Sequence, residues 1–288
     1  MERNKTNFLL FPGFRKKAVT LNYDDGVRQD TRLIDIMLKH GLKGTFNVNS
    51  GLFEKEYNGQ TTGRMTVEEL IKLYKESGME VGVHGVKHLS LSHLDVSVAC
   101  NEIASDRKEL ESLFGKVIKG MAYAYGTYTD ETVQMLKVCG INYSRTTIAT
   151  EQFNLPTDWL RLPTTCHHKN PKLMDLAKEF LQAEMNPYSV SSYPMWFLLW
   201  GHSYEFDRDD NWNKIEDFAE LIGGKDDIWY ATTGEVFDYV RDYNRLEFSI
   251  DGSMVHNPSA QPIYYNNFGK FFEIKPGETV YIEKRSFL

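Results

Sequence analysis

Apolar, β-rich runs alternate with stretches of helical periodicity from about Lys17 to Arg245, and this alternation limits the possible fold more than any other feature of the chain. Repeated strand–helix units favour a parallel sheet whose faces are covered by helices. About eight such units in a chain of this length are typical of a (β/α) barrel. The pattern therefore predicts an α/β fold, a complete or incomplete (β/α) barrel of roughly seven to eight strands, over residues 1–245.

The expected elements follow one another closely along the chain. Strands are expected at Ala18–Tyr23, Thr45–Val48, Glu80–Val83, Gly120–Tyr125, Asn142–Thr146, Arg161–Thr165, Trp196–Trp200 and Ile228–Ala231. Helices are expected at Thr31–His40, Thr66–Ser77, Asp95–Phe114, Thr129–Cys139, Leu173–Ala183, Asn211–Leu221 and Thr233–Tyr243. Two helices have capping boxes, Thr66–Glu69 and Thr232–Glu235, in which a hydroxyl and a carboxylate satisfy free N–H groups reciprocally.

The pattern changes after Arg245. Leu246–Ile250 alternates between apolar and polar residues, which is typical of a strand. Lys275–Thr279 has the composition of a turn, and the apolar runs on either side of it, at 271–274 and 280–282, predict a hairpin. Residues 246–288 are therefore predicted to form a small antiparallel β appendage, whose role and whose part in any oligomer the sequence leaves open.

Charge and composition narrow the function class. The chain has 33 Lys+Arg against 40 Asp+Glu, a net charge of −7, which argues against nucleic acid because phosphate binding needs a basic surface. Met195–Trp200 is among the longest apolar runs, far below the roughly 18 residues of a membrane helix.

The 3 cysteines lack C-x-x-C spacing, so we expect neither a disulfide framework nor a cysteine zinc site. A cytoplasmic location fits, or a secreted one if a signal peptide was removed. The charge run Asp106–Glu111 is typical of a solvated helix face.

Two carboxylates follow the first expected strand. Asp24 and Asp25 would lie at the carboxyl end of that strand, where barrel enzymes build their active sites. Adjacent carboxylates are costly unless a cation or a proton relieves their repulsion, although Asp-Asp-Gly is also ordinary turn chemistry. Neighbours in a regular strand point to opposite faces, so both can face one site only if the strand ends or bulges there. Gly26 suits such a break because glycine adopts positive φ without strain.

Histidines follow two other expected strands. His84 and His88 come directly after the third strand, and imidazoles four residues apart meet at one point if the backbone forms a helical turn. With one carboxylate they would form a three-ligand set with open positions for water and substrate. His202 follows the apolar strand Trp196–Trp200 and could donate a proton near neutral pH. His84 and His88 could be surface residues, and His202 alone could be a satisfied histidine at the barrel rim, but three loops that bring Asp and His to one rim indicate a site.

Taken in order, these motifs resemble those of the polysaccharide deacetylases, the NodB-homology family of carbohydrate esterases. The matching segments are Asn22–Gly26, Gly44–Val48, Glu80–His84 with His88, Met121–Gly126 and Leu198–His202. The resemblance spans about residues 17–243 and leaves the appendage unexplained. It implies a distorted (β/α) barrel that removes acetyl groups from sugars with one divalent metal ion, commonly zinc, with cobalt or nickel also used.

The resemblance also implies roles for individual residues. The implied metal ligands are Asp25, His84 and His88. Asp24 matches the general base, Tyr125 the residue whose backbone N–H holds the oxyanion, and His202 the general acid.

One position departs from the family pattern. Ala122 stands where the family usually has an arginine that pairs with the base carboxylate. Arg145 and Arg161, near later strands, could replace it from another direction or contact the substrate. Trp200 and Tyr204 at the exit of a strand could stack on a sugar ring.

These features predict a hydrolase that removes acetyl groups from an acetylated glycan or oligosaccharide, with no nucleic-acid or membrane partner. Two alternatives stay open. One is an amidohydrolase of the metal-independent type that acts on a small non-sugar amide with the same fold. The other is a non-catalytic carbohydrate-binding relative, which Ala122 favours, but retention of both Asp24 and His202 opposes it because binding alone needs neither.

Overall fold

Strand β2 (Lys17–Asp24) is the centre of the sheet in the computed structural model, which describes residues 8–54, 63–186 and 194–282. Every residue of β2 is buried, as expected for a parallel strand covered on both faces. One edge of β2 pairs with β9 (Met195–Gly201). β10 (Ile228–Tyr230) pairs with the first half of β2, and β3 (Gly44–Val48) pairs with the second half.

The sheet is parallel and closes into a barrel. From β3 it continues through β4 (Glu80–Val83), β5 (Gly120–Ala122), β6 (Tyr143–Ala149) and β7 (Leu162–Thr164), and β9 pairs with β8 (Cys166–His167). Thr165 joins β7 to β8, so one interrupted strand pairs with β6 on one side and with β9 on the other. The predicted distorted (β/α) barrel is therefore confirmed.

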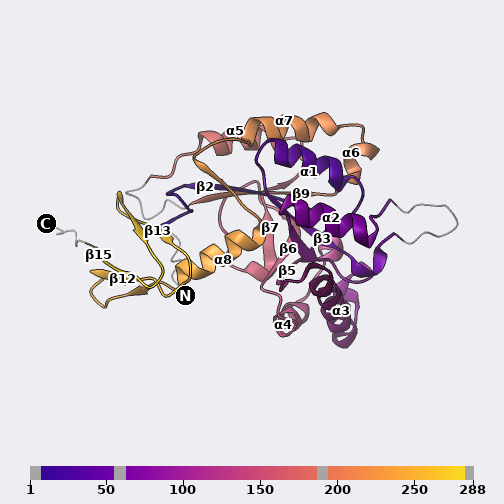
Figure 1. Cartoon of the computed structure of the whole chain (residues 1–288), viewed down its shortest axis with the longest axis horizontal. Coiled ribbons are helices and arrows are strands. Elements are labelled where there is room, and N and C mark those ends of the chain that lie inside the picture. Colours follow the sequence, from indigo (N-terminus) through magenta and orange to yellow (C-terminus); the bar gives the residue numbers. More distant parts are fainter. Residues whose placement is uncertain (1–7, 55–62, 187–193, 283–288) are drawn as a thin grey trace.

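Helices surround the barrel (Figure 1). They are α1 (Asp30–Lys39), α2 (Val67–Ser77), α3 (Val96–Phe114), α4 (Asp130–Val138), α5 (Leu173–Gln182), α6 (Tyr204–Arg208), α7 (Trp212–Ile222) and α8 (Thr233–Asn244). Both predicted capping boxes are present, at the starts of α2 and α8. The main apolar core lies between the strands and these helices, as the alternation of elements predicts.

Helix α8 covers the amino-terminal end of the barrel. The Gly234 N–H donates to Glu80 Oε2 at the start of β4, at 2.8 Å. The Thr45 hydroxyl at the start of β3 donates to Thr233 Oγ1, at 3.0 Å. The carboxyl ends of β3 and β4 lie at the other end of the barrel from these contacts, so they are available for a site.

The C-terminal residues form two antiparallel three-stranded sheets. One contains β1 (Leu9–Leu10), β13 (Ile263–Asn267) and β14 (Lys270–Ile274), and the other contains β11 (Glu247–Phe248), β12 (Met254–His256) and β15 (Thr279–Tyr281). The predicted hairpin between residues 271–274 and 280–282 is wrong, because β14 pairs with β13 and β15 pairs with β12. β1 comes from the segment before the barrel, so the appendage includes residues that the sequence assigned to the barrel.

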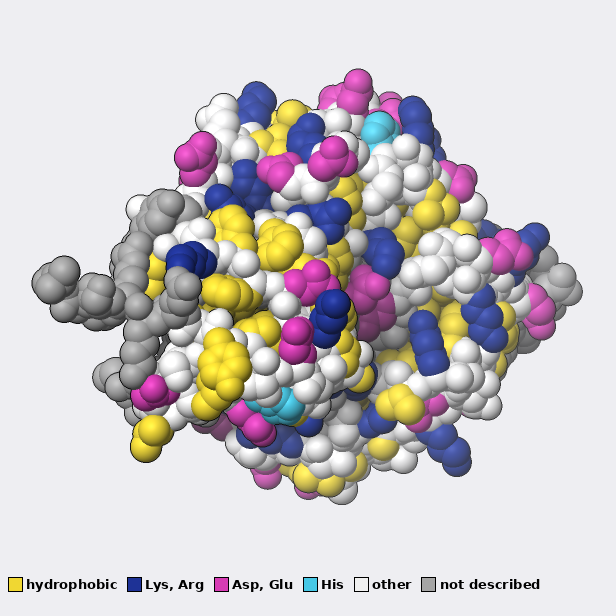
Figure 2. Space-filling view, turned by 60° about the vertical axis from the view of Figure 1, so that its left-hand side comes forward, with side chains coloured by type: hydrophobic (Ala, Val, Ile, Leu, Met, Phe, Trp, Pro, Cys, Tyr) yellow, Lys and Arg dark blue, Asp and Glu magenta, His cyan; other side chains and the backbone are white. Residues whose placement is uncertain are grey.

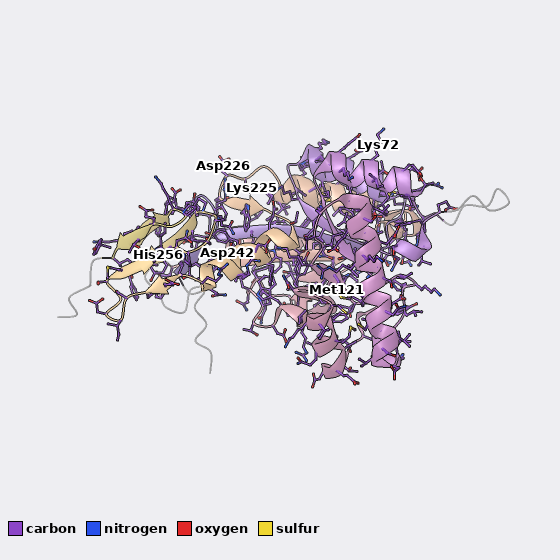
Figure 3. The ribbon with its side chains drawn as sticks, turned by 60° about the horizontal axis from the view of Figure 1, so that its bottom comes forward. Lys72, Met121, Lys225, Asp226, Asp242 and His256 are labelled. Carbon is purple, nitrogen blue, oxygen red and sulfur yellow. The ribbon has the colours of Figure 1, made fainter. Side chains whose placement is uncertain are left out.

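The appendage packs on α8. The Tyr239 hydroxyl donates to Leu10 O at 2.7 Å and accepts from Tyr264 N at 3.0 Å. Gln261 Nε2 donates to Asp242 Oδ2 at 2.8 Å, beside the appendage strands in Figure 3. The appendage therefore lies at the amino-terminal end of the barrel and does not extend a groove at the carboxyl end. Apolar side chains gather on its outer surface (Figure 2); the exposed ones include Phe248, Ile250, Phe271 and Tyr281.

Two further observations concern the helices and the cysteines. Within the described residues, no helix is both long enough and apolar enough to cross a membrane. Cys100, Cys139 and Cys166 are free thiols, although the Sγ atoms of Cys100 and Cys139 lie 3.5 Å apart.

Candidate active site

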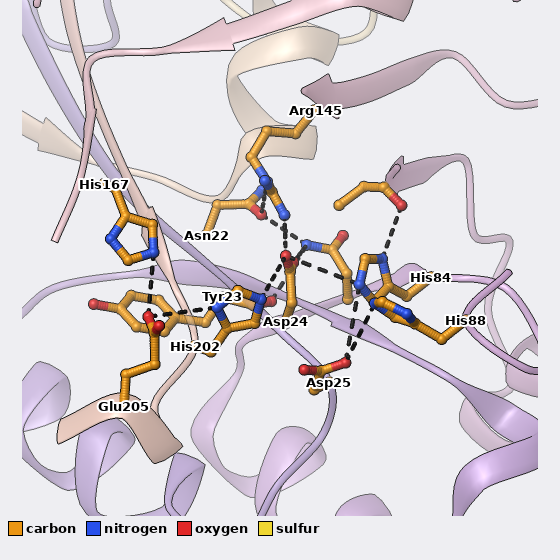
Figure 4. A network of polar contacts seen from close by, with 12 residues as sticks. Asn22, Tyr23, Asp24, Asp25, His84, His88, Arg145, His167, His202 and Glu205 are labelled. Atoms are coloured by element: carbon orange, nitrogen blue, oxygen red, sulfur yellow. Dashed lines mark hydrogen bonds and ion pairs between the residues drawn. The ribbon is translucent and has the colours of Figure 1, made fainter. Parts of the chain in front are cut away.

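The chain turns sharply where β2 ends, between two adjacent carboxylates (Figure 4). β2 ends at Asp24, and Asp25 and Gly26 have φ angles of 88° and 63°. This left-handed pair replaces the alternation of a strand, so the two carboxylates do not point to opposite faces. Asp24 Oδ2 lies 3.9 Å and Asp25 Oδ1 lies 4.0 Å from the same atom, His84 Nε2. The strand break expected at Gly26 is therefore present.

His84 is oriented by the neighbouring strand. Its Nδ1 lies 2.9 Å from Ala122 O, and because a carbonyl accepts, Nδ1 carries the hydrogen and Nε2 keeps a free lone pair. Nε2 is buried and has no hydrogen-bond partner among the described residues. The ring centroids of His88 and His84 lie 4.7 Å apart. The prediction of a helical turn between them is wrong. Gly85 and His88 have φ angles of 84° and 57°, so a non-helical loop brings the two rings together.

Asp25, His84 and His88 together fit a divalent cation. Asp25 Oδ1 lies 4.0 Å from His84 Nε2 and 3.8 Å from His88 Nε2. If one oxygen and two imidazole nitrogens each bound an ion at about 2.0–2.2 Å, the distances between these ligand atoms would be comparable to the two distances in the structure. The unpartnered, buried Nε2 of His84 supports this fit, because a buried polar atom needs a partner.

A second cluster, His167, His168 and Glu205, fits a cation less well. The Lys169 N–H donates to His167 Nδ1 at 3.0 Å, so the neutral ring carries its hydrogen on Nε2 and cannot ligate there. That Nε2 lies 3.2 Å from Glu205 Oε2, and Lys169 Nζ lies 3.1 Å from Glu205 Oε1. Glu205 is therefore already surrounded by hydrogen donors and positive charge, which holds its pKa well below the usual range despite burial.

Asp24 is held as a buried anion by Arg145. Both side chains are buried, and the Arg145 guanidinium pairs with Asp24 Oδ2. Asn47 Nδ2 donates to Asp24 Oδ1 at 2.9 Å, and Arg145 Nε donates to Asn22 Oδ1 at 3.0 Å. Burial raises the pKa of Asp24, but the neighbouring positive charge, above all that of Arg145, outweighs it and holds the pKa well below its usual range. Asp24 is therefore ionised at neutral pH.

The structure separates the two arginines that the sequence proposed. Arg145 occupies the place beside the base that Ala122 leaves open, whereas Arg161 pairs with Asp158 and Asp130. The expectation that Arg145 contacts the substrate is wrong, because its exposed fraction is 0%. The expected stacking of Trp200 on a sugar is not supported either, since Trp200 is 9% exposed and Arg145 lies over its ring, 4.5 Å from the centroid.

The two arginines can be compared by their effect on stability. In metal-free protein, Arg145→Leu should lower the free energy of unfolding by about 3–5 kcal/mol, because Asp24 would keep a buried charge without its partner. Arg161→Leu should lower it by less than about 1 kcal/mol, because its ion pairs are partly exposed. Urea unfolding of both variants measures the difference, and equal effects would contradict the assignment of Arg145 to Asp24.

His202 directly follows β9 and lies between two carboxylates. Its Nε2 lies 3.9 Å from Asp24 Oδ2 and its Nδ1 lies 3.4 Å from Glu205 Oε2. Burial lowers the pKa of His202, but the carboxylates of Glu205, Asp24 and Asp25 outweigh it, so the pKa is raised. The imidazole is therefore favoured in its protonated form, which a proton donor requires.

Two tyrosines border this group of side chains. Tyr125 has a φ of 58° in a short turn after β5, and its ring lies 4.5 Å from that of His88. It is 67% exposed, so it lies at the surface of the site. The ring of Tyr204 lies 5.3 Å from that of His202 and is partly exposed. Both tyrosines could therefore touch a substrate.

Sequence reasoning missed two residues at the centre of the site. Glu205 could have been found, because it follows His202 by three residues, the spacing of neighbours on a helix. The sequence contains no comparable spacing that would have identified Arg64. Its guanidinium contacts the Asp25 carbonyl oxygen and lies 3.3 Å from Asp25 Oδ1, and it reaches Asn49 Oδ1 at 3.2 Å. Arg64 therefore helps to hold the left-handed turn that presents Asp25.

Comparison with known families agrees with this arrangement. The family model for polysaccharide deacetylase matches residues 12–144. Over these residues, just under half of the chain, the sequence is similar to that family. The resemblance seen in the motifs is thereby confirmed. The matched part contains Asp24, Asp25, His84 and His88, and it ends just before Arg145.

Individual relatives match parts of the chain. A chitin deacetylase of Arthroderma benhamiae is 34% identical over 120 residues, which are 39% of this chain and 29% of that protein. A crystal structure from Mycobacterium smegmatis, provisionally named a polysaccharide deacetylase, has a TM-score of 0.57 at 16% identity and covers 81% of this chain and 93% of its own. A family 4 carbohydrate esterase from Streptomyces lividans, in complex with acetate, has a TM-score of 0.50 at 13% identity, with 74% and 91% covered. The two structures show that the fold is shared.

Proposed function

We propose that this chain is a metal-dependent hydrolase that removes acetyl groups from an acetylated glycan. The observation that carries the proposal is that Asp25, His84 and His88 converge next to a proton acceptor and a proton donor. Asp24 is kept ionised by Arg145, and His202 is favoured in its protonated form by Glu205. A base and an acid beside a cation-binding set are the groups that acyl hydrolysis needs.

The three ligands would hold one divalent ion, zinc or alternatively cobalt or nickel. Such an ion supplies Lewis acidity when bound: it polarises a carbonyl oxygen and brings the pKa of water from 15.7 to about 7. Asp24 needs this help, because an anion stabilised so strongly by Arg145 is a weak base toward ordinary water.

The chain's own residues would carry the proton and the developing charge. Asp24 takes the proton of the attacking water. The Tyr125 N–H donates to the oxyanion, and losing such a donor typically costs about 10²–10³ in rate. His202 then gives its proton to the leaving amine or alcohol, and the Glu205 carboxylate, 3.4 Å from its other ring nitrogen, stabilises the positive charge of the ring.

An acetate-release assay with metals added back tests the proposal. Acetylated chitooligosaccharides, peptidoglycan fragments and acetylxylan are suitable substrates, and the expected result is acetate release that a chelator abolishes and zinc restores. Full activity in chelator-treated protein would contradict the metal role and favour the metal-independent alternative. Bound zinc without acetate from any substrate would favour a carbohydrate-binding relative.

The role of Glu205 predicts a change in the pH profile. His202 acts in its protonated form, so activity is lost as the pH rises through its pKa. Glu205→Gln removes a carboxylate that raises this pKa, so the alkaline limb of kcat/KM should move to lower pH. Asp209→Asn is the matched control, because Asp209 shares Lys169 and Arg208 with Glu205 and has no hydrogen bond or ion pair with His202 among the described residues. An alkaline limb that stays in place in Glu205→Gln would contradict this role.

A further inference from the structure

The carboxylate of Asp106 on α3 is fully buried beneath the candidate site, although its charge run predicts a solvated face. Oδ2 accepts from the N–H groups of His84 and Gly85, both at 2.9 Å. Oδ1 accepts from the Ser50 N–H at 2.7 Å. The His84 N–H is shared with Val48 O at 3.1 Å. Both oxygens of one side chain thus join the loops that follow β3 and β4.

The rest of the His84–His88 loop is held from outside as well. Glu102, one helical turn before Asp106, accepts from the Lys87 N–H at 2.6 Å. Asn49 Nδ2 donates to the carbonyl oxygens of His84 and Gly85, at 2.8 and 2.9 Å. A loop that is not helical has to satisfy its backbone groups elsewhere, and here α3 and Asn49 supply the partners.

We infer that Asp106 is a positioning residue that sets the two imidazoles for the cation, an inference that rests on the proposed function. His84 and His88 meet through a loop with two left-handed residues, and such a backbone persists when its surroundings fix it. Asp106 fixes it at the first histidine and ties it to the loop of Ser50. Because ligands must be held within about 0.5 Å of the productive geometry, loosening this tie should lower metal affinity.

Two isosteric amide substitutions on the same helix test the inference. Asp106→Asn turns one accepting oxygen into an NH₂ group that faces an N–H donor, because both oxygens of Asp106 accept. Zinc affinity, measured by competition with a chromogenic chelator, should fall about 10–100-fold. Glu102→Gln keeps an oxygen for the Lys87 N–H, so its affinity should change by less than about threefold.

The visible spectrum of cobalt-loaded protein gives a second measure, independent of activity. It should be altered in Asp106→Asn and match the wild type in Glu102→Gln. Asp106→Asn protein with an intact fold, wild-type zinc affinity and a wild-type spectrum would overturn the inference alone. Wild-type protein that binds neither zinc nor cobalt would instead contradict the proposed function.

If Asp106→Asn does not fold, amide hydrogen exchange in the wild type decides. The Gly85 and Ser50 N–H groups should exchange slowly, because Asp106 is the acceptor that the structure gives them. Exchange at the rate of an unprotected loop amide would overturn the inference.

Discussion

Replacing His84 with alanine is expected to lower metal affinity by more than about 100-fold and to abolish acetate release in the same sample. Loss of an outer partner of a metal site already costs about 10–100-fold, and His84 is proposed to contact the ion itself. The remaining oxygen of Asp25 and nitrogen of His88, 3.8 Å apart, would hold the ion by two contacts. Metal content after dialysis, measured by mass spectrometry, and acetate release from the same preparation check both effects.

His93→Ala is the matched control for this variant. His93 lies in the turn after the same loop and is exposed, outside the cation-binding set. It should keep both metal and activity. His84→Ala protein that retains stoichiometric metal and turns over substrate would contradict the assignment of the ligands.

Replacing Asp24 with asparagine is expected to leave metal binding in place and to lower kcat by about 10²–10⁴, the usual contribution of a general base. The amide is the same size as the carboxylate but cannot take a proton from water. KM should change little, because Asp24 is buried and offers no surface to a sugar. Steady-state kinetics and metal content of the same preparation measure the separation of the two effects.

This variant also leaves Arg145 buried without its ionic partner. Its free energy of unfolding should therefore fall by about 3–5 kcal/mol. Its kinetics should be measured well below its melting temperature. Asp24→Asn protein that is folded, loaded with metal and as fast as the wild type would show that another group accepts the proton.

The barrel and the break in β2 could be predicted from the sequence because both are local. Alternation of apolar runs with helical periods reports which faces are covered. The rule that strand neighbours point apart required a bend at Asp25, and Gly26 supplied it. The family motifs added the chemistry, and residues 12–144 match that family.

What could not be predicted depends on contacts between distant segments. Arg145 and Arg161 look alike in sequence, and which of them reaches Asp24 depends on the curvature of the sheet. Asp106 sits in a charge run, and its burial follows from the two loops that fold over α3. The appendage strands pair across long separations, so a local turn signal selected the wrong partner for β14.

The pairing of β1 with β13 has a consequence for the order of assembly. Leu9 lies opposite Tyr265, so this small sheet joins residues separated by nearly the whole chain. Closing so long a loop is entropically unfavourable until the intervening segment is compact. During synthesis the barrel strands emerge before β13, so β1 has no partner until the barrel segment has been made. We therefore expect the pairing of β1 with β13 to form late in folding, after the cation-binding loops at the opposite rim.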